Sequence, residues 1–259
     1  MKKLLCVLLA ALMLLCLAAC EKPSAADPTE PEKQTVTVYV PVSIVQSDAT
    51  GQTITVQYIY EEGWQTKETF VVQLRSENSA SSVGYDMIFG NKTVRMDYGQ
   101  GGQTIDMVYN EKGQTVSQTV TFPEGASVTQ SVTLFTYDAR GRMTVQESQM
   151  YYAGQAEPVV SKTEYTYTDT ESGSKGTCTT DYIVQEMHYD ADDRLIRTVT
   201  FTWGNEVTRS EYAYDEHGNQ IKVETYVSGT LTSSTVNTFA AYEVTSQQAQ
   251  QMPYFRQGK

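Results

Sequence analysis

Side chains that exchange protons near neutral pH are scarce in this chain of 259 residues. Two histidines occur, His188 and His217, and both stand beside segments with the composition of turns. A general acid or base needs a partner group at a fixed distance, and neither a Gly-x-Ser-x-Gly elbow nor a phosphate-binding glycine loop accompanies either histidine. We therefore predict that the protein is not an enzyme. A hydrolase that uses unmarked carboxylates is the catalytic alternative.

The carboxylates between residues 190 and 193 are the strongest candidate for a metal site. Asp190, Asp192 and Asp193 invite comparison with a calcium loop. However, the position that requires glycine holds Leu195, and the twelfth position holds Phe201. We predict no metal and no other cofactor.

Cys20 is the residue with the most specific chemistry. Two lysines follow the first methionine, residues 4–17 are almost entirely apolar, and small residues lead to Cys20, as in an export signal. Residues 17–20, Leu-Ala-Ala-Cys, resemble the lipobox of bacterial lipoproteins, whose cysteine is diacylated after cleavage. An uncleaved membrane helix is the alternative, but the apolar run is at the short end of the roughly 17 to 25 residues that a span needs.

This resemblance implies a lipid anchor. Residues 1–19 would be removed as a signal peptide, and two acyl chains of the palmitate type on Cys20 would hold the protein stably at a membrane. Residues 20–34 are rich in proline and charge and have no apolar periodicity, so we expect a disordered tether. The expected location is the extracytoplasmic face of the cell membrane. Cys178 would then be the one thiol left, and we expect it to pack as a small buried hydrophobe.

The charge of the chain excludes one class of partner. The formal net charge is -12, and loss of the two lysines of the signal peptide makes it -14. Nucleic acid binding needs clustered lysine and arginine, and no basic stripe occurs. We therefore predict no nucleic acid partner.

Residues 35–245 have the composition of β-strands, with β-branched and aromatic residues that alternate with polar ones and with turn residues about every dozen positions. Large side chains two positions apart, which share one face of a strand, precede a turn eight times: Tyr58/Tyr60, Met87/Phe89, Met96/Tyr98, Met107/Tyr109, Phe135/Tyr137, Tyr165/Tyr167, Met187/Tyr189 and Tyr212/Tyr214. Helical periodicity is nearly absent. Residues 246–259 are expected to be a flexible tail, with one helical turn at 246–251 as the alternative.

Four turns share one pattern, at residues 110–113, 138–141, 190–193 and 215–218. Each fits a type I turn whose fourth residue is left-handed, a conformation that glycine adopts without steric cost. Asp193 replaces glycine in one of them, which aspartate tolerates better than most residues. In two of these hairpins an arginine follows the turn, and we expect it to pair with the aspartate that begins the turn.

Three segments, 137–143, 189–195 and 214–219, resemble the YD repeats of Rhs-type bacterial surface proteins, and 109–114 is a weaker copy. In large members of that family many such hairpins wind into a shell around a toxin domain. This chain is short and its copy at Tyr167 runs into an irregular segment. The resemblance therefore implies a β-meander at a cell surface and not a toxin.

We predict an all-β fold, an antiparallel up-and-down meander of repeated hairpins whose sheet curves and can fold over on itself. The predicted function is that of a non-enzymatic binding or scaffold module for a glycan, a peptide or a protein partner, because tyrosine offers apolar area together with a hydroxyl. The alternative is a carrier that cups a lipid or another apolar molecule in a half-barrel sheet. The candidate contact face consists of Tyr137, Tyr165, Tyr167, Tyr189, Tyr212 and Tyr214.

Cys20→Ala is the variant that tests the anchor. It should release the protein from isolated membranes into the soluble fraction, because the acylated thiol is the predicted attachment. Fractionation followed by immunoblotting measures the effect, and a variant that stays membrane-bound would refute lipidation as the attachment.

Overall fold

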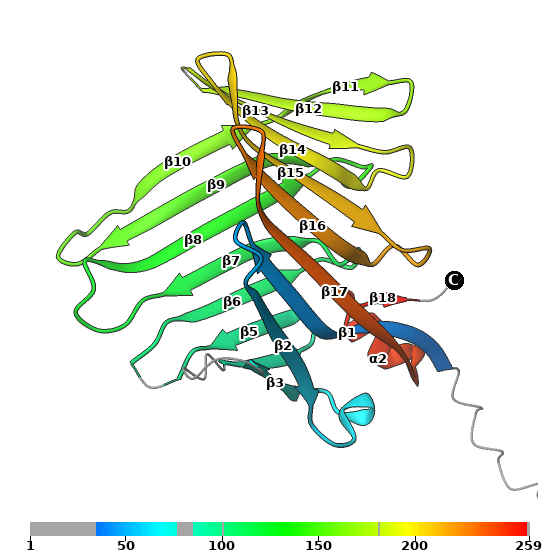
Figure 1. Cartoon of the computed structure of the whole chain (residues 1–259). Helices are drawn as coiled ribbons and strands as arrows, with labels where there is room; N and C mark the ends of the chain where they lie inside the picture. The colour runs from blue at the N-terminus through cyan, green and yellow to red at the C-terminus, as the bar shows by residue number, and fades with distance from the viewer. Residues whose placement is uncertain (1–34, 77–84, 100, 181, 258–259) are drawn as a thin grey trace, which may run out of the picture. The chain divides into compact units, whose positions relative to one another are not determined.

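The computed structural model of the chain describes residues 35–76, 85–99, 101–180 and 182–257 (Figure 1). The predicted signal peptide at 1–19 and the predicted tether at 20–34 lie outside the described residues. Residues 35–259 form one compact unit, so the β region is a single domain. Among the described residues there is no helix with the length and hydropathy that a membrane span requires.

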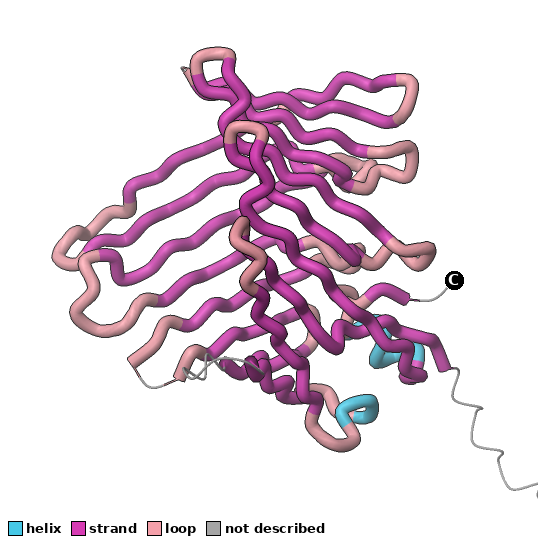
Figure 2. The backbone as a smooth tube through the Cα atoms, viewed as in Figure 1, coloured by secondary structure: helices cyan, strands magenta, loops and turns pink. Residues whose placement is uncertain are grey.

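The unit is built from antiparallel strands, as the sequence predicts, and strand dominates the backbone in Figure 2. One 18-stranded sheet contains all strands of the described part. They are β1 (Thr35–Asp48), β2 (Thr53–Tyr60), β3 (Phe70–Ser76), β4 (Tyr85–Gly90), β5 (Thr93–Asp97), β6 (Thr104–Tyr109), β7 (Thr115–Thr121), β8 (Val128–Tyr137), β9 (Met143–Tyr152), β10 (Val159–Glu164), β11 (Thr166–Thr170), β12 (Gly173–Thr180), β13 (Ile183–Tyr189), β14 (Leu195–Thr202), β15 (Asn205–Tyr214), β16 (Gln220–Val227), β17 (Thr230–Thr245) and β18 (Arg256–Gln257).

The meander nearly closes on itself. β1 pairs with β2 next to it in sequence and also with β17, from Thr35 opposite Thr245 to Asp48 opposite Ser233. On the other side, β10 and β11 are two halves of one strand that is interrupted at Tyr165; β10 pairs with β9 and β11 pairs with β12. The predicted curved, folded-over meander is therefore confirmed, in a barrel-like form.

The four predicted turns have the predicted geometry. The fourth residue is left-handed in each, with φ of 75° at Gly113, 89° at Gly141, 57° at Asp193 and 81° at Gly218. The nitrogen of this residue donates to the carbonyl of the first turn residue at 3.0 to 3.1 Å, and the register of each hairpin shifts by one residue beside the turn. We call these segments the YD turns. They place all four hairpins in one register, so equivalent side chains recur at equivalent places.

A similar hydrogen bond recurs at four places in the meander, two of them in YD-type hairpins. A side chain of an outgoing strand donates to the carbonyl of the first residue of the preceding return strand. Tyr137 and Tyr214 end their strands, whereas Tyr167 and Asn237 lie within β11 and β17. The donor and acceptor pairs are Tyr137 and Thr115 at 2.7 Å, Tyr167 and Met143 at 2.6 Å, Tyr214 and Leu195 at 2.8 Å, and Asn237 and Gln220 at 2.9 Å. We call this contact the clasp. In three cases the donor is a tyrosine hydroxyl and in the fourth it is an asparagine amide.

Ion pairs of the YD turns lie beside the interruption at Tyr165, where β10 ends and β11 begins. Arg142 binds Asp138 at 2.7 Å, the predicted pair, and its guanidinium lies 4.5 Å from the ring centroid of Tyr167. Arg140 reaches across to Asp169 of β11 at 2.7 Å and also to Asp193. These contacts connect the β8–β9 hairpin to the strands that follow the interruption at Tyr165.

The core lies against β1 to β5 and includes the C-terminal segment. Trp64 of the short 3-10 helix η1 (Trp64–Thr66) packs on Phe70, with ring centroids 5.2 Å apart, and Phe255 lies 5.4 Å from Phe89. Helix α2 (Ser246–Gln251), capped by Thr245, leads the chain into this cluster, and Met252 is buried.

The C-terminal segment is thus a correction to the predicted flexible tail. The helical turn expected as the alternative is present, and Pro253 ends it. Local sequence pointed to flexibility because the segment is rich in glutamine and lacks apolar periodicity. Burial of Ala249, Met252 and Phe255 outweighs that weak local preference.

Tyr137→Phe tests the clasp. Removal of the hydroxyl leaves the carbonyl of Thr115 without that donor, so we expect the free energy of unfolding to fall by about 1 kcal/mol. Urea denaturation measures this change. The matched control is Tyr152→Phe, whose hydroxyl contacts only the sulfur of Met150 at 4.0 Å among the described contacts. Equal losses in the two variants would contradict a stabilising clasp.

Candidate functional site

The six tyrosines of the predicted contact face are buried or half-buried. Tyr189 is 8% exposed, and its ring meets that of Tyr167 edge-on at 5.8 Å. Tyr165 donates its hydroxyl to the side chain of Gln185 at 3.1 Å, and the hydroxyl of Tyr212 lies 3.4 Å from that of Thr198. Three members of the face, Tyr137, Tyr167 and Tyr214, serve as clasp donors, as described above. The hydroxyls therefore turn toward the protein.

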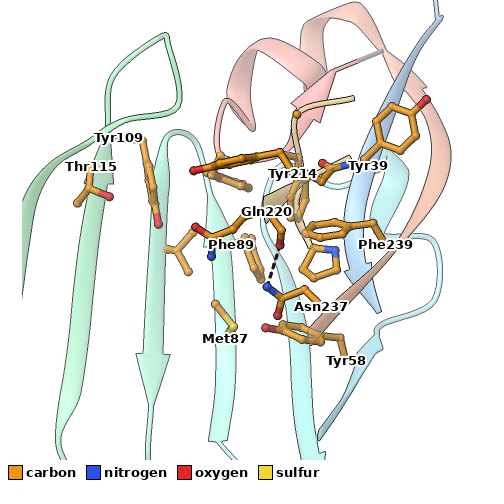
Figure 3. Close-up of a pocket in the computed structure, with 16 residues that line it drawn as sticks. Tyr39, Tyr58, Met87, Phe89, Tyr109, Thr115, Tyr214, Gln220, Asn237 and Phe239 are labelled. Carbon is orange, nitrogen blue, oxygen red and sulfur yellow. Dashed lines mark hydrogen bonds between the residues drawn. The ribbon is translucent and has the colours of Figure 1, made fainter. Parts of the chain in front are cut away.

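A cavity of about 710 Å³ lies between β1, β2, β4 to β7, β17, the β15–β16 hairpin and the C-terminal segment (Figure 3). Eight of its sixteen lining residues are aromatic: Tyr39, Tyr58, Phe89, Tyr109, Tyr214, Phe239, Tyr254 and Phe255. Four more are polar and uncharged: Thr115, Asn219, Gln220 and Asn237. No lining residue carries a charge at neutral pH. Tyr214 is the one member of the predicted face that lines this cavity.

The cavity lies where two side chains are shorter than those at the equivalent positions of the other hairpins. The position after the YD turn holds an arginine in two hairpins, and Arg194 lies 5.6 Å from the ring centroid of Tyr214. In the β15–β16 hairpin that position holds the shorter Asn219, which binds the side chain of Asp215 at 2.8 Å. The clasp that follows is made by Asn237 instead of tyrosine, and Figure 3 shows its amide bound to Gln220. Two shorter side chains at neighbouring repeat positions thus leave space between the strands.

Polar groups at the cavity are neutral and able to bind a ligand. Asn219 is 2% exposed, and its side-chain amide oxygen is buried without a hydrogen-bond partner in the described structure. Burial raises the pKa values of Tyr58, Tyr109 and Tyr254, so their hydroxyls stay protonated at neutral pH and can both donate and accept. The site combines flat apolar rings with uncharged hydrogen-bonding groups.

Neither histidine enters this cavity. His188 lies 3.1 Å from Glu186, which also binds Lys175 at 2.7 Å on a strand face. His217 stacks on Tyr39 with ring centroids 4.1 Å apart, beside the cavity wall. Among the described residues, no group of three or more histidine, cysteine, aspartate or glutamate side chains could hold a metal ion. The thiol of Cys178 is buried, as expected.

A second cavity of about 590 Å³ lies beside α2. Its lining is mostly polar and includes Gln247, Gln250 and Gln251, together with the ion pair between Lys92 and Glu111 at 3.3 Å. It has no aromatic lining residue. We therefore take the larger, aromatic cavity as the candidate site.

The comparisons with known proteins give a distant structural likeness. The chain is similar to a porin-like protein from Bacteroides uniformis ATCC 8492, with a TM-score of 0.41 and 10% sequence identity over 80% of this chain and 96% of that chain. A likeness at this level assigns no function. No protein-family model and no curated protein matches the chain. The resemblance to YD repeats stays a prediction.

The raised tyrosine pKa values predict instability in alkali. A phenol whose pKa is higher in the folded state than in the unfolded state stabilises the fold fully below the unfolded pKa, near 10, and that stability is lost as pH rises through the folded pKa. Tyr137, whose pKa burial raises to about 12, belongs to this group with the cavity tyrosines. Urea unfolding should therefore give a constant free energy between pH 8 and 9 and a fall above pH 10. A flat profile up to pH 12 would contradict the burial of these rings.

Proposed function

We propose that the protein is a non-enzymatic binding module that takes an uncharged, hydroxyl-bearing ligand, of the saccharide class, into the aromatic cavity. The observation that carries this proposal is the lining itself, which joins eight aromatic rings with four uncharged polar side chains in about 710 Å³. Ligand cavities in proteins commonly measure roughly 300 to 1,000 Å³. The volume suits a short oligosaccharide.

The chemistry of the lining favours a neutral amphipathic ligand. Aromatic rings pack against the flat apolar faces of a sugar ring, while the amides of Asn219, Gln220 and Asn237 can exchange hydrogen bonds with its hydroxyls. A charged ligand would find no counter-ion in this wall.

The same lining disfavours the carrier alternative. A cavity for an acyl chain is expected to be lined by valine, isoleucine and leucine. Here Val94 is the one residue of these three types, with Met87 and Pro41 as the other apolar non-aromatic members. We therefore keep the carrier as an outcome of the test.

The proposed setting is the extracytoplasmic face of a membrane, with lipid on Cys20 as the anchor. The lipobox-like residues 17–20 support it. A module confined there would meet glycans of the cell envelope or of its surroundings.

Asn219→Arg is the sharpest variant for this site. Arginine at the equivalent position pairs with the turn aspartate in two sister hairpins, so the variant should fold, with Asp215 as its partner. Its longer, charged side chain should fill the cavity. We expect an array of neutral di- to tetrasaccharides to yield a hit for the native chain, and calorimetry with that saccharide to show at least about a tenfold loss in the variant, or 1.4 kcal/mol.

Arg142→Asn is the matched control. It makes the reverse exchange in the β8–β9 hairpin, where neither Arg142 nor the ring of Tyr167 that it covers lines the cavity, and should leave saccharide binding unchanged. Phe239→Ala is a second site variant and should also weaken binding. If no saccharide binds and a fatty acid or phospholipid co-purifies with the protein, the function is that of a lipid carrier and the proposed saccharide binding is wrong.

A further inference from the structure

Exposed apolar side chains gather at the hairpin tips opposite the YD turns. Tyr182 is 48% exposed and Trp203 75%, and Val207, Val227 and Leu231 are 36% to 41% exposed. They belong to three successive hairpins, β12–β13, β14–β15 and β16–β17, whose tips lie in the upper part of Figure 1. We call these five residues the tip patch.

Backbone hydrogen bonds make the tip patch one continuous feature. The nitrogen of Trp203 donates to the carbonyl of Tyr182 at 3.1 Å, and the nitrogen of Ser228 donates to the carbonyl of Val207 at 2.9 Å. The rings of Tyr182 and Trp203 stack at 4.7 Å with an interplanar angle of 5°. The three tips thus present a fixed aromatic and aliphatic edge.

Trp203 occupies a position that folding alone does not favour. Trp203 and Gly204 form a two-residue hairpin loop in which both residues have positive φ, 53° and 79°. Such loops favour asparagine, aspartate or glycine first, and a bulky residue there is strained. The equivalent position of the β16–β17 loop, which has the same geometry, holds Ser228. A strained, exposed tryptophan at a tip calls for a contact outside the fold.

We propose that the tip patch inserts into the interfacial layer of a lipid bilayer whose headgroups are zwitterionic and carry no net charge. The patch lies at hairpin tips and contributes to neither of the two cavities, so it fits a planar partner better than a small molecule. Tryptophan and tyrosine prefer the membrane–water boundary, where the ring is buried and the polar atom stays wet.

The charge of the protein favours zwitterionic over anionic membranes. The described residues of the three tip turns, Tyr182, Trp203, Gly204, Ser228 and Gly229, include no lysine or arginine. The whole chain is acidic, with a formal charge of -12. Anionic headgroups would repel it, whereas zwitterionic lipid would not. This contact is independent of the ligand in the cavity.

The test uses residues 20–259 with Cys20→Ala, so that no acyl chain is present, and vesicles of phosphatidylcholine. Trp64 is 3% exposed in the core, so a change in emission reports on Trp203. We expect sedimentation with the vesicles, a blue shift, and quenching by lipids brominated on the acyl chain. Vesicles with 30% phosphatidylglycerol, about a third anionic lipid, should bind less protein at low salt.

Trp203→Asn separates binding from folding. Asparagine suits the loop, so the melting temperature should stay equal or rise, while sedimentation with phosphatidylcholine vesicles should fall about tenfold or more. The control Val236→Asn changes an exposed apolar residue in the middle of β17 and should bind as the parent does. Unchanged vesicle binding by Trp203→Asn, unquenched emission of the parent, or binding that requires anionic lipid would each overturn the proposal.

Discussion

The clasp between successive hairpins is the contact on which the rest of the structure depends. Antiparallel hairpins can be paired along their strands and still twist away from one another at their ends. At four places a side-chain donor of an outgoing strand, bound to the first carbonyl of the previous return strand, ties the neighbouring strands together. Each such bond contributes roughly 0.5 to 1.5 kcal/mol. Repeated along the meander, it sets which way the tyrosines face.

This constraint has its largest effect where the ladder is broken. Between β9 and β11 no strand pairing exists in the described structure, because β10 takes the pairing with β9 and β11 pairs with β12. The clasp from Tyr167 to Met143 and the ion pairs of Arg140 and Arg142 bridge this seam. The near closure of the sheet therefore rests on side chains as well as on backbone ladders.

The same constraint explains the candidate site. Where the repeat keeps its tyrosine and arginine, the space between hairpins is filled. Where Asn219 and Asn237 replace them, the bond is kept by a shorter amide and a cavity opens beside it. The candidate site thus lies at a departure from the repeat.

The local construction of this protein could be predicted from its sequence and its long-range arrangement could not. The turn at 190–193 is set by residues within it, so the left-handed Asp193 was foreseeable. The pairing of β1 with β17 joins segments about two hundred residues apart, as in Thr35 opposite Thr245, and no local pattern specifies it. Alternation predicts which tyrosines share a face of the sheet, but it does not show which face is covered. The sequence does contain one indication of the candidate site, because Asn219 is the one asparagine that directly follows a YD turn.

Tyrosine nitration with peptide mass spectrometry tests the central claim most directly, because it reports the accessibility of each ring. The account predicts that Tyr98 and Tyr182, which are 36% and 48% exposed, are nitrated first in the native protein. The clasp donors Tyr137, Tyr167 and Tyr214 should react only after denaturation. Rapid nitration of these three in the native state, at the rate of Tyr182, would contradict a structure held together by its tyrosine hydroxyls.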